Sequence, residues 1–116
     1  MNNLFTKVLS KLATAASLAI ATSFAAFAVH TETDVDQVGL KFTKKTTEVK
    51  AGGVVTFHNS DDVIHNIMTI DENDMTEDYG LQKPGETIKT KFEQQGEFQV
   101  RCSIHPKMKM TISVTK

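Results

Sequence analysis

The chain has 116 residues, of which 40% are hydrophobic and 23% are charged, and its formal net charge is −1. This length suits one domain with a modest core and is too short for a large enzyme. The near-neutral charge gives no indication of binding to nucleic acid or to an anionic membrane surface.

The first 28 residues have the layout of a secretory signal peptide. Lysines lie near the start, an apolar run follows from Leu12 to Ile20, and Ala26-Phe27-Ala28 matches a small-x-small cleavage site. Serine and threonine interrupt the apolar segment, so we do not expect stable insertion into a membrane. We expect cleavage after Ala28, export to the periplasm and one mature domain of residues 29–116. That domain keeps 11 of the 13 basic and all 14 acidic residues, so its formal charge is −3.

Beyond residue 28 the sequence predicts an all-β domain. Short runs alternate apolar and polar residues, turn residues separate the runs, and no stretch of ten or more residues has helical periodicity. Several short strands in a domain of this size favour a sandwich or small barrel. The polar stretch after Ala28 is interpreted as a linker, and the acidic stretch 71–80 as a loop. Strands are expected around residues 38–42, 49, 55–57, 64–70, 88–92, 98–102 and 112–114.

Cys102 is the only cysteine, and the signal peptide directs it to an oxidising compartment. It cannot form an internal disulfide. The thiol could be inert and buried, could pair with another chain, or could be a thiolate capped by a metal ion. Because Phe98, Val100 and Cys102 share one face of an expected strand, we expect the sulfur to point inward at the end of that strand.

The segment Cys102-Ser103-Ile104-His105-Pro106-Lys107-Met108 places a thiolate, an imidazole and a thioether within seven residues. Two histidines and one cysteine with a weak axial methionine are the donor set of an electron-transfer copper site. The second histidine is expected to be His65, which lies at a predicted strand end. Met108 is the expected axial ligand, and Met110 is the alternative.

Other chemistries fit these residues less well. Structural zinc normally takes four Cys or His ligands in paired clusters, and only one cysteine is present. No carboxylate cluster that would suit a hard cation accompanies the motif. A Cys–His nucleophile would need an accessible sulfur and an orienting acid, so we do not expect an enzyme.

The sequence resembles the cupredoxins, and most closely the amicyanins among them. The resemblance covers nearly all of residues 29–116. It rests mainly on Leu81-x-x-Pro84-Gly85-Glu86, on Phe92 and on Gly96-x-Phe98-x-Val100-x-Cys102-x-x-His105-Pro106-x-Met108. Upstream, Val49-x-x-Gly52-x-x-Val55-x-Phe57-x-Asn59 leading into His65-Asn66 is also similar to that family.

The resemblance implies a cupredoxin-like Greek-key β-sandwich with one copper ion at one end. The implied ligands are His65, Cys102 and His105, with Met108 as the axial ligand. Asn66 is implied to tie the His65 loop to the Cys102 loop by hydrogen bonding, which would fix the ligand geometry.

The resemblance also implies a type 1 (blue) copper protein that transfers single electrons between redox protein partners and acts on no small-molecule substrate. His105 is expected at the surface, where Pro106 and Met68 would complete an apolar patch for electron entry and exit. A periplasmic copper carrier that uses the same ligands is the alternative function.

Overall fold

Strands account for all the regular secondary structure in the described part of the chain. The computed structural model describes residues 19–26 and 31–116, and within them it contains eight strands and no helix. The expected cleavage site after Ala28 lies outside the described residues. Within the described residues, no helix has the length and apolar character needed to span a membrane. The all-β prediction is confirmed.

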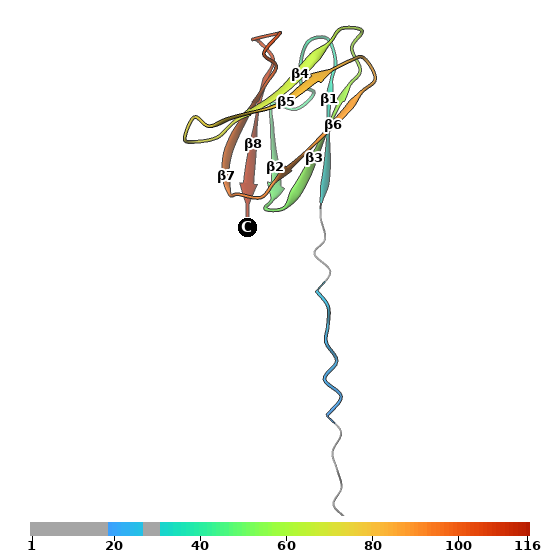
Figure 1. Cartoon of the computed structure of the whole chain (residues 1–116), viewed down its shortest axis with the longest axis vertical. Helices are drawn as coiled ribbons and strands as arrows, with labels where there is room; N and C mark the ends of the chain where they lie inside the picture. The colour runs from blue at the N-terminus through green and yellow to red at the C-terminus, as the bar shows by residue number, and fades with distance from the viewer. Residues whose placement is uncertain (1–18, 27–30) are drawn as a thin grey trace, which may run out of the picture.

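The strands form two sheets that pack face to face as a β-sandwich (Figure 1). In both sheets one pair of strands is parallel, namely β1 with β3 and β2 with β8, and the other pairs are antiparallel. The first sheet has the order β1 (Glu32–Gln37), β3 (Gly53–Asn59) and β6 (Thr87–Phe92). The second has the order β2 (Thr46–Lys50), β8 (Lys109–Thr115), β7 (Gly96–Arg101), β4 (His65–Ile70) and β5 (Thr76–Gln82).

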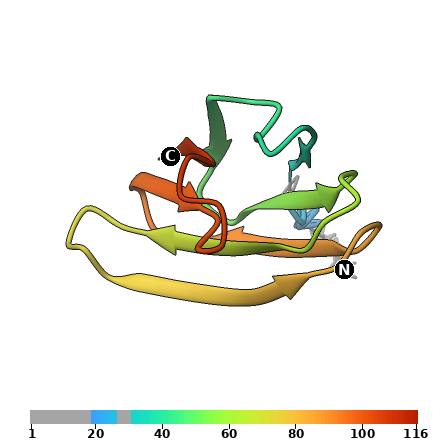
Figure 2. The ribbon, with the colours of Figure 1, turned by 90° about the horizontal axis from the view of Figure 1, so that it is seen from above.

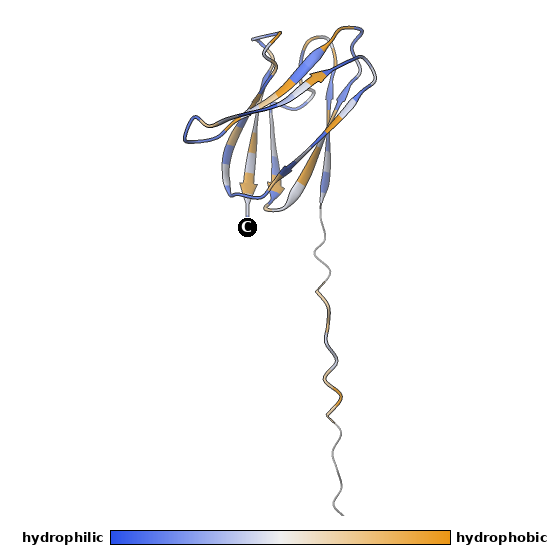
Figure 3. Ribbon diagram, viewed as in Figure 1, coloured by the Kyte–Doolittle hydropathy of each residue, from blue (hydrophilic) through white to orange (hydrophobic). Residues whose placement is uncertain are grey.

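The core lies between the two sheets, because the apolar side chains on the inner face of each strand point there. Hydrophobic segments alternate with hydrophilic ones along strands such as β3 and β8 (Figure 3). The ring of Phe57 meets that of Phe42 at 6.1 Å between centroids, and Phe92 meets Phe98 at 5.1 Å. Burying one such side chain stabilises the fold by about 1.5–3 kcal/mol. The core therefore provides a rigid frame for the loops at its end.

The prediction of a strand at residues 38–42 is wrong. The first strand is β1, which lies in the stretch interpreted as a linker. Only Val35 and Gln37 of β1 are fully buried, so the sequence offers too short an apolar alternation to reveal it. The chain then turns at Gly39 and Leu40, whose φ angles are +63° and +59°. Because both residues adopt the left-handed conformation, no strand can continue there.

The acidic stretch 71–80 is a loop only in its first half. Asp71 closes that loop because its Oδ1 accepts the N–H groups of Asn73 and Met75. From Thr76 the chain forms β5, the edge strand beside β4. Most side chains of β5 are exposed, so backbone pairing and not apolar alternation defines this strand.

Candidate metal centre

Three of the predicted ligand residues come together at one end of the five-stranded sheet. His65 is the first residue of β4, and Cys102 directly follows the last residue of β7. Because β4 and β7 are antiparallel neighbours, the start of one lies beside the end of the other. The loop of residues 102–108 between β7 and β8 then folds over this point and brings His105 to it (Figure 2).

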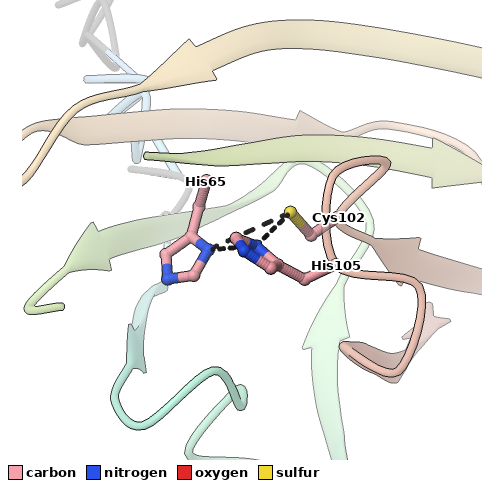
Figure 4. A group of neighbouring side chains, drawn as sticks. All are labelled: His65, Cys102 and His105. Carbon is pink, nitrogen blue, oxygen red and sulfur yellow. Dashed lines mark hydrogen bonds between the residues drawn. The ribbon is translucent and has the colours of Figure 1, made fainter. Parts of the chain in front are cut away.

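Their donor atoms form a compact triangle (Figure 4). Nδ1 of His65 lies 3.2 Å from Nδ1 of His105, and Sγ of Cys102 lies 3.6 Å from His105 Nδ1 and 4.0 Å from His65 Nδ1. Among the residues that the structure describes, no other group of three His, Cys, Asp or Glu side chains has such an arrangement.

This triangle has the size that a metal ion requires. In a trigonal set with metal–nitrogen distances of ~2.0 Å and a metal–sulfur distance of ~2.3 Å, the nitrogens are separated by about 3.5 Å and each is about 3.7 Å from the sulfur. The observed separations of 3.2, 3.6 and 4.0 Å lie close to these values. The donor set of one thiolate and two imidazoles is the one expected for electron-transfer copper.

The centre is sheltered on one side and open on the other. His65 and Cys102 are fully buried, whereas His105 is half-buried. Bulk water and oxidants therefore have little access to the sulfur, as expected for a cysteine in an oxidising compartment. Of the three donor residues, His105 is the one that reaches the surface.

Asn66 joins three segments around the centre. Its backbone N–H donates to Cys102 Sγ at 3.3 Å, and its Oδ1 accepts the N–H of Ser103 at 3.0 Å. Its Nδ2 donates to Asp78 Oδ1 at 2.7 Å and to the carbonyl of Gly80 at 3.2 Å. Asn66 thus connects the start of β4 to the 102–108 loop and to β5.

Sequence analysis missed Asp61, which holds the other side of the His65 ring. Oδ2 of Asp61 lies 2.7 Å from His65 Nε2. The same carboxylate accepts N–H bonds from Gly39 at 2.6 Å and from Leu40 at 3.0 Å. A histidine that donates Nε2–H to a carboxylate keeps Nδ1 unprotonated and free to bind a metal. A carboxylate four residues before the candidate ligand His65 was the signal that could have revealed it.

Burial tends to raise the pKa of the Asp61 carboxyl, but the hydrogen bonds from Leu40, His65 and Gly39 outweigh burial. The net effect holds the pKa of Asp61 below its ordinary value. Asp61 is therefore a charged partner that fixes the ring of His65, and the turn formed by Gly39 and Leu40 holds the Asp61 carboxylate in turn.

The two candidate axial methionines lie in different settings. Met108 is fully buried in the 102–108 loop, where its N–H donates to the His105 carbonyl at 2.8 Å and its carbonyl accepts the N–H of Cys102 at 3.4 Å. Met110 lies on β8 in register with Val100, within the apolar core. The backbone of Met108 is thus tied to two predicted ligands, and that of Met110 is tied to the sheet.

Several residues near the centre in sequence or on neighbouring loops are apolar and at least partly exposed. Pro106 is exposed beside His105, and Met68 is half-buried on β4 in register with Arg101. Loops that contact the centre also carry exposed apolar residues, which are Val38, Leu40, Val63, Ile64 and Ile104. This end of the sandwich therefore combines a half-buried histidine with an apolar surface.

Comparison with known proteins gives a consistent result. The model of the family "copper binding proteins, plastocyanin/azurin family" matches residues 29–115. The chain is 32% identical over 115 residues to chloroplastic plastocyanin of Pisum sativum, which covers 90% of this chain and 67% of that protein. It is also 32% identical over 99 residues to the methylamine utilization protein MauL of Methylorubrum extorquens, covering 84% of this chain and 87% of that protein.

Solved structures share the fold. A mutant of amicyanin in its reduced Cu(I) form superposes with a TM-score of 0.66 at 22% identity, covering 72% of this chain and 81% of that one. A purple cupredoxin from Nitrosopumilus maritimus superposes with a TM-score of 0.63 at 24% identity, covering 72% of this chain and 99% of that one. A copper-containing nitrite reductase from Thermus scotoductus superposes with a TM-score of 0.66 at 29% identity, covering 74% of this chain but only 23% of that one. The predicted cupredoxin-like β-sandwich is confirmed.

Proposed function

Since the chain belongs to the plastocyanin/azurin family of copper-binding proteins, we propose that it carries single electrons between redox proteins through one copper ion. The copper ligands in this proposal are His65, Cys102, His105 and Met108. The observation that carries the proposal is the triangle of two imidazole nitrogens and one sulfur, with every edge between 3.2 and 4.0 Å.

Copper bound there would supply one-electron chemistry through its two common oxidation states. The protein's part is to keep the donors fixed, so that little rearrangement accompanies each electron. Asp61 holds the His65 ring at Nε2, and Asn66 holds the Cys102 loop through the N–H of Ser103. The surrounding apolar core excludes water and would help to set the reduction potential.

We propose that electrons enter and leave through His105. Its ring is half-buried, and Ile104 and Pro106 beside it are exposed and apolar. An apolar surface around this ring would allow a partner to approach closely without leaving water between the two proteins. The proposed partners are redox proteins, and no small-molecule substrate is part of the mechanism. A domain-sized match to 23% of a nitrite reductase is no support for enzymatic activity.

Export to the periplasm, after removal of residues 1–28, is part of the proposal. The signal-peptide layout supports it. The single cysteine supports it too, because a thiolate that binds a metal in a buried site is protected in an oxidising compartment.

Copper delivery is the second candidate function. The half-exposed His105 would give a competing protein ligand access to the metal, so the same donors could hand it over. Cyclic voltammetry of the mature copper-loaded protein separates the two functions. An electron carrier gives a reversible one-electron wave and keeps Cu(I) against a competing chelator. Rapid loss of Cu(I) without a stable couple would replace the first proposal by the second.

A further inference from the structure

Cationic side chains surround a groove beside the 102–108 loop. The groove measures about 570 Å³ and lies between residues 41–45 and the adjoining parts of β7 and β8. Phe42, Met108 and Met110 line it, although each of them is almost completely buried. We call it the basic groove, and its five cations are Lys41, Lys45, Arg101, Lys107 and Lys109.

The charges of the basic groove are not neutralised by the protein itself. Among residues 19–26 and 31–116, ion pairs link Lys89 to Glu32 and Lys91 to Glu93, but none involves a cation of the groove. The guanidinium of Arg101 donates only to the neutral side-chain amide oxygen of Gln99, at 2.8 Å from Nη2 and 3.2 Å from Nε. Five uncompensated positive charges therefore lie together on a chain whose net charge is −1.

A group of five of the 14 acidic residues lies away from the groove. Within the five-stranded sheet, β4 separates β7, which borders the groove, from the edge strand β5. The loop after β4 and the first half of β5 carry Asp71, Glu72, Asp74, Glu77 and Asp78. Positive charge at the groove and negative charge on this separate segment would turn the basic groove toward an approaching anionic protein.

The basic groove adjoins the metal centre. Arg101 directly precedes Cys102, and Lys107 and Lys109 flank Met108. Met108, one of the proposed ligands, also lines the groove. A partner seated there would touch the loop that carries three of the proposed ligands, so docking and electron exchange would occur at adjoining surfaces.

We propose that the basic groove is the docking surface for an acidic redox protein that exchanges electrons with the metal centre. The inference rests on the proposed function. Its cations steer the partner and set its orientation. Steering of this kind raises association rates by roughly 10- to 1000-fold and weakens with ionic strength.

The first test uses the copper-free protein and is independent of electron transfer. The redox-inert paramagnetic anion hexacyanochromate(III) is titrated in, and broadening of backbone amide NMR signals is mapped. The proposal expects the strongest broadening at residues 41–45, 101 and 107–109. Uniform broadening, or broadening confined to other lysines, would overturn it.

The second test measures electron transfer between the copper-loaded protein and an acidic c-type cytochrome by stopped flow at low ionic strength. The double variant Lys41→Glu/Lys45→Glu lies outside the 102–108 loop, so the ligands themselves are unchanged. We expect it to lower the rate at least about tenfold. The matched control Lys50→Glu/Lys116→Glu makes the same charge change where β2 and β8 end, at the far end of these strands from the groove. It should lower the rate far less.

A basic c-type cytochrome should show the opposite response to Lys41→Glu/Lys45→Glu, with a faster rate. If the two double variants lowered the rate with the acidic cytochrome equally, net charge and not the basic groove would control the rate, which would contradict the proposal. An anion map on the groove together with an unchanged cytochrome rate would mean that the groove binds small anions only. Loss of a reversible copper couple would instead defeat the proposed function and leave the NMR map intact.

Discussion

Oδ2 of Asp61 lies 2.7 Å from Nε2 of His65, on the side of the ring opposite the metal centre. The carboxylate is itself fixed by the N–H groups of Gly39 and Leu40. The orientation of a buried candidate ligand therefore depends on a turn more than 20 residues earlier in the chain.

Asp61→Ala should weaken copper binding by about 10- to 100-fold, since partners of metal-binding histidines typically contribute this much. Asp61→Asn retains an acceptor for Nε2–H without the charge, so its copper affinity should lie between those of the wild-type protein and Asp61→Ala. Competition with a chelator gives the affinity, and ring-nitrogen NMR of the copper-free protein reports the His65 tautomer. The exposed neighbour Asp62 supplies the control Asp62→Ala. Unchanged affinity and tautomer in Asp61→Ala would show that this contact is only structural.

The axial assignment predicts different effects for two similar substitutions. Met108→Leu removes a thioether from the 102–108 loop and should change the visible and electron paramagnetic resonance spectra of the copper(II) protein. Met110→Leu conserves volume in the core and should cost less than about 1.5 kcal/mol of unfolding free energy with little spectral change. If only Met110→Leu altered the spectra, Met110 would be the axial ligand.

Asn66→Ala should destabilise even the copper-free protein. The substitution leaves the N–H of Ser103 without its acceptor, and it removes one of the two donors to Asp78 Oδ1, where the N–H of Gly80 remains. A loss of about 1–3 kcal/mol in the free energy of unfolding is expected, measured by urea denaturation. Asn73→Ala, in the exposed loop before β5, is the control. Equal stability of the two variants would be inconsistent with the connecting role of Asn66.

The pH dependence of Tyr79 can be followed directly, because it is the only tyrosine in the chain. Burial, and then the hydrogen bond that its hydroxyl donates to Glu77, raise the pKa of Tyr79 from 10.0 to about 12. In the unfolded chain the phenol ionises at the lower value. The corresponding stability is therefore complete below pH 10.0 and is lost as the pH rises toward about 12.

Ultraviolet titration of the phenol measures this pKa. Glu77→Gln should move the midpoint back toward the ordinary value, because it removes the negative charge next to the hydroxyl. Glu72→Gln, in the loop before β5, should have no such effect. A midpoint near 10 in the folded wild-type protein would refute the prediction.

The 102–108 loop was predictable because its donors are close in the sequence. Cys102, His105 and Met108 lie within seven residues, and a strand before them fixes where the sulfur points. The prediction of His65 as a ligand depended on its position at an expected strand end and on the family resemblance. No short-range pattern connects it to Cys102, which lies 37 residues away.

The features that sequence analysis missed depend on contacts distant in the chain. Asp61 acts through Gly39 and Leu40, whose left-handed backbone cannot be deduced from apolar alternation. The strand β1 has one large buried apolar residue, Val35, and is held by parallel pairing with β3. The basic groove joins residues 41–45 to residues 99–111, so only the folded chain reveals its charge.

The most direct test of the copper centre is titration of the mature protein with copper(II), followed by visible and electron paramagnetic resonance spectroscopy. The account predicts saturation at one copper per chain, an intense blue colour from the Cys102 thiolate, and loss of that colour in Cys102→Ala. A colourless wild-type complex, or a blue complex that survives Cys102→Ala, would contradict it.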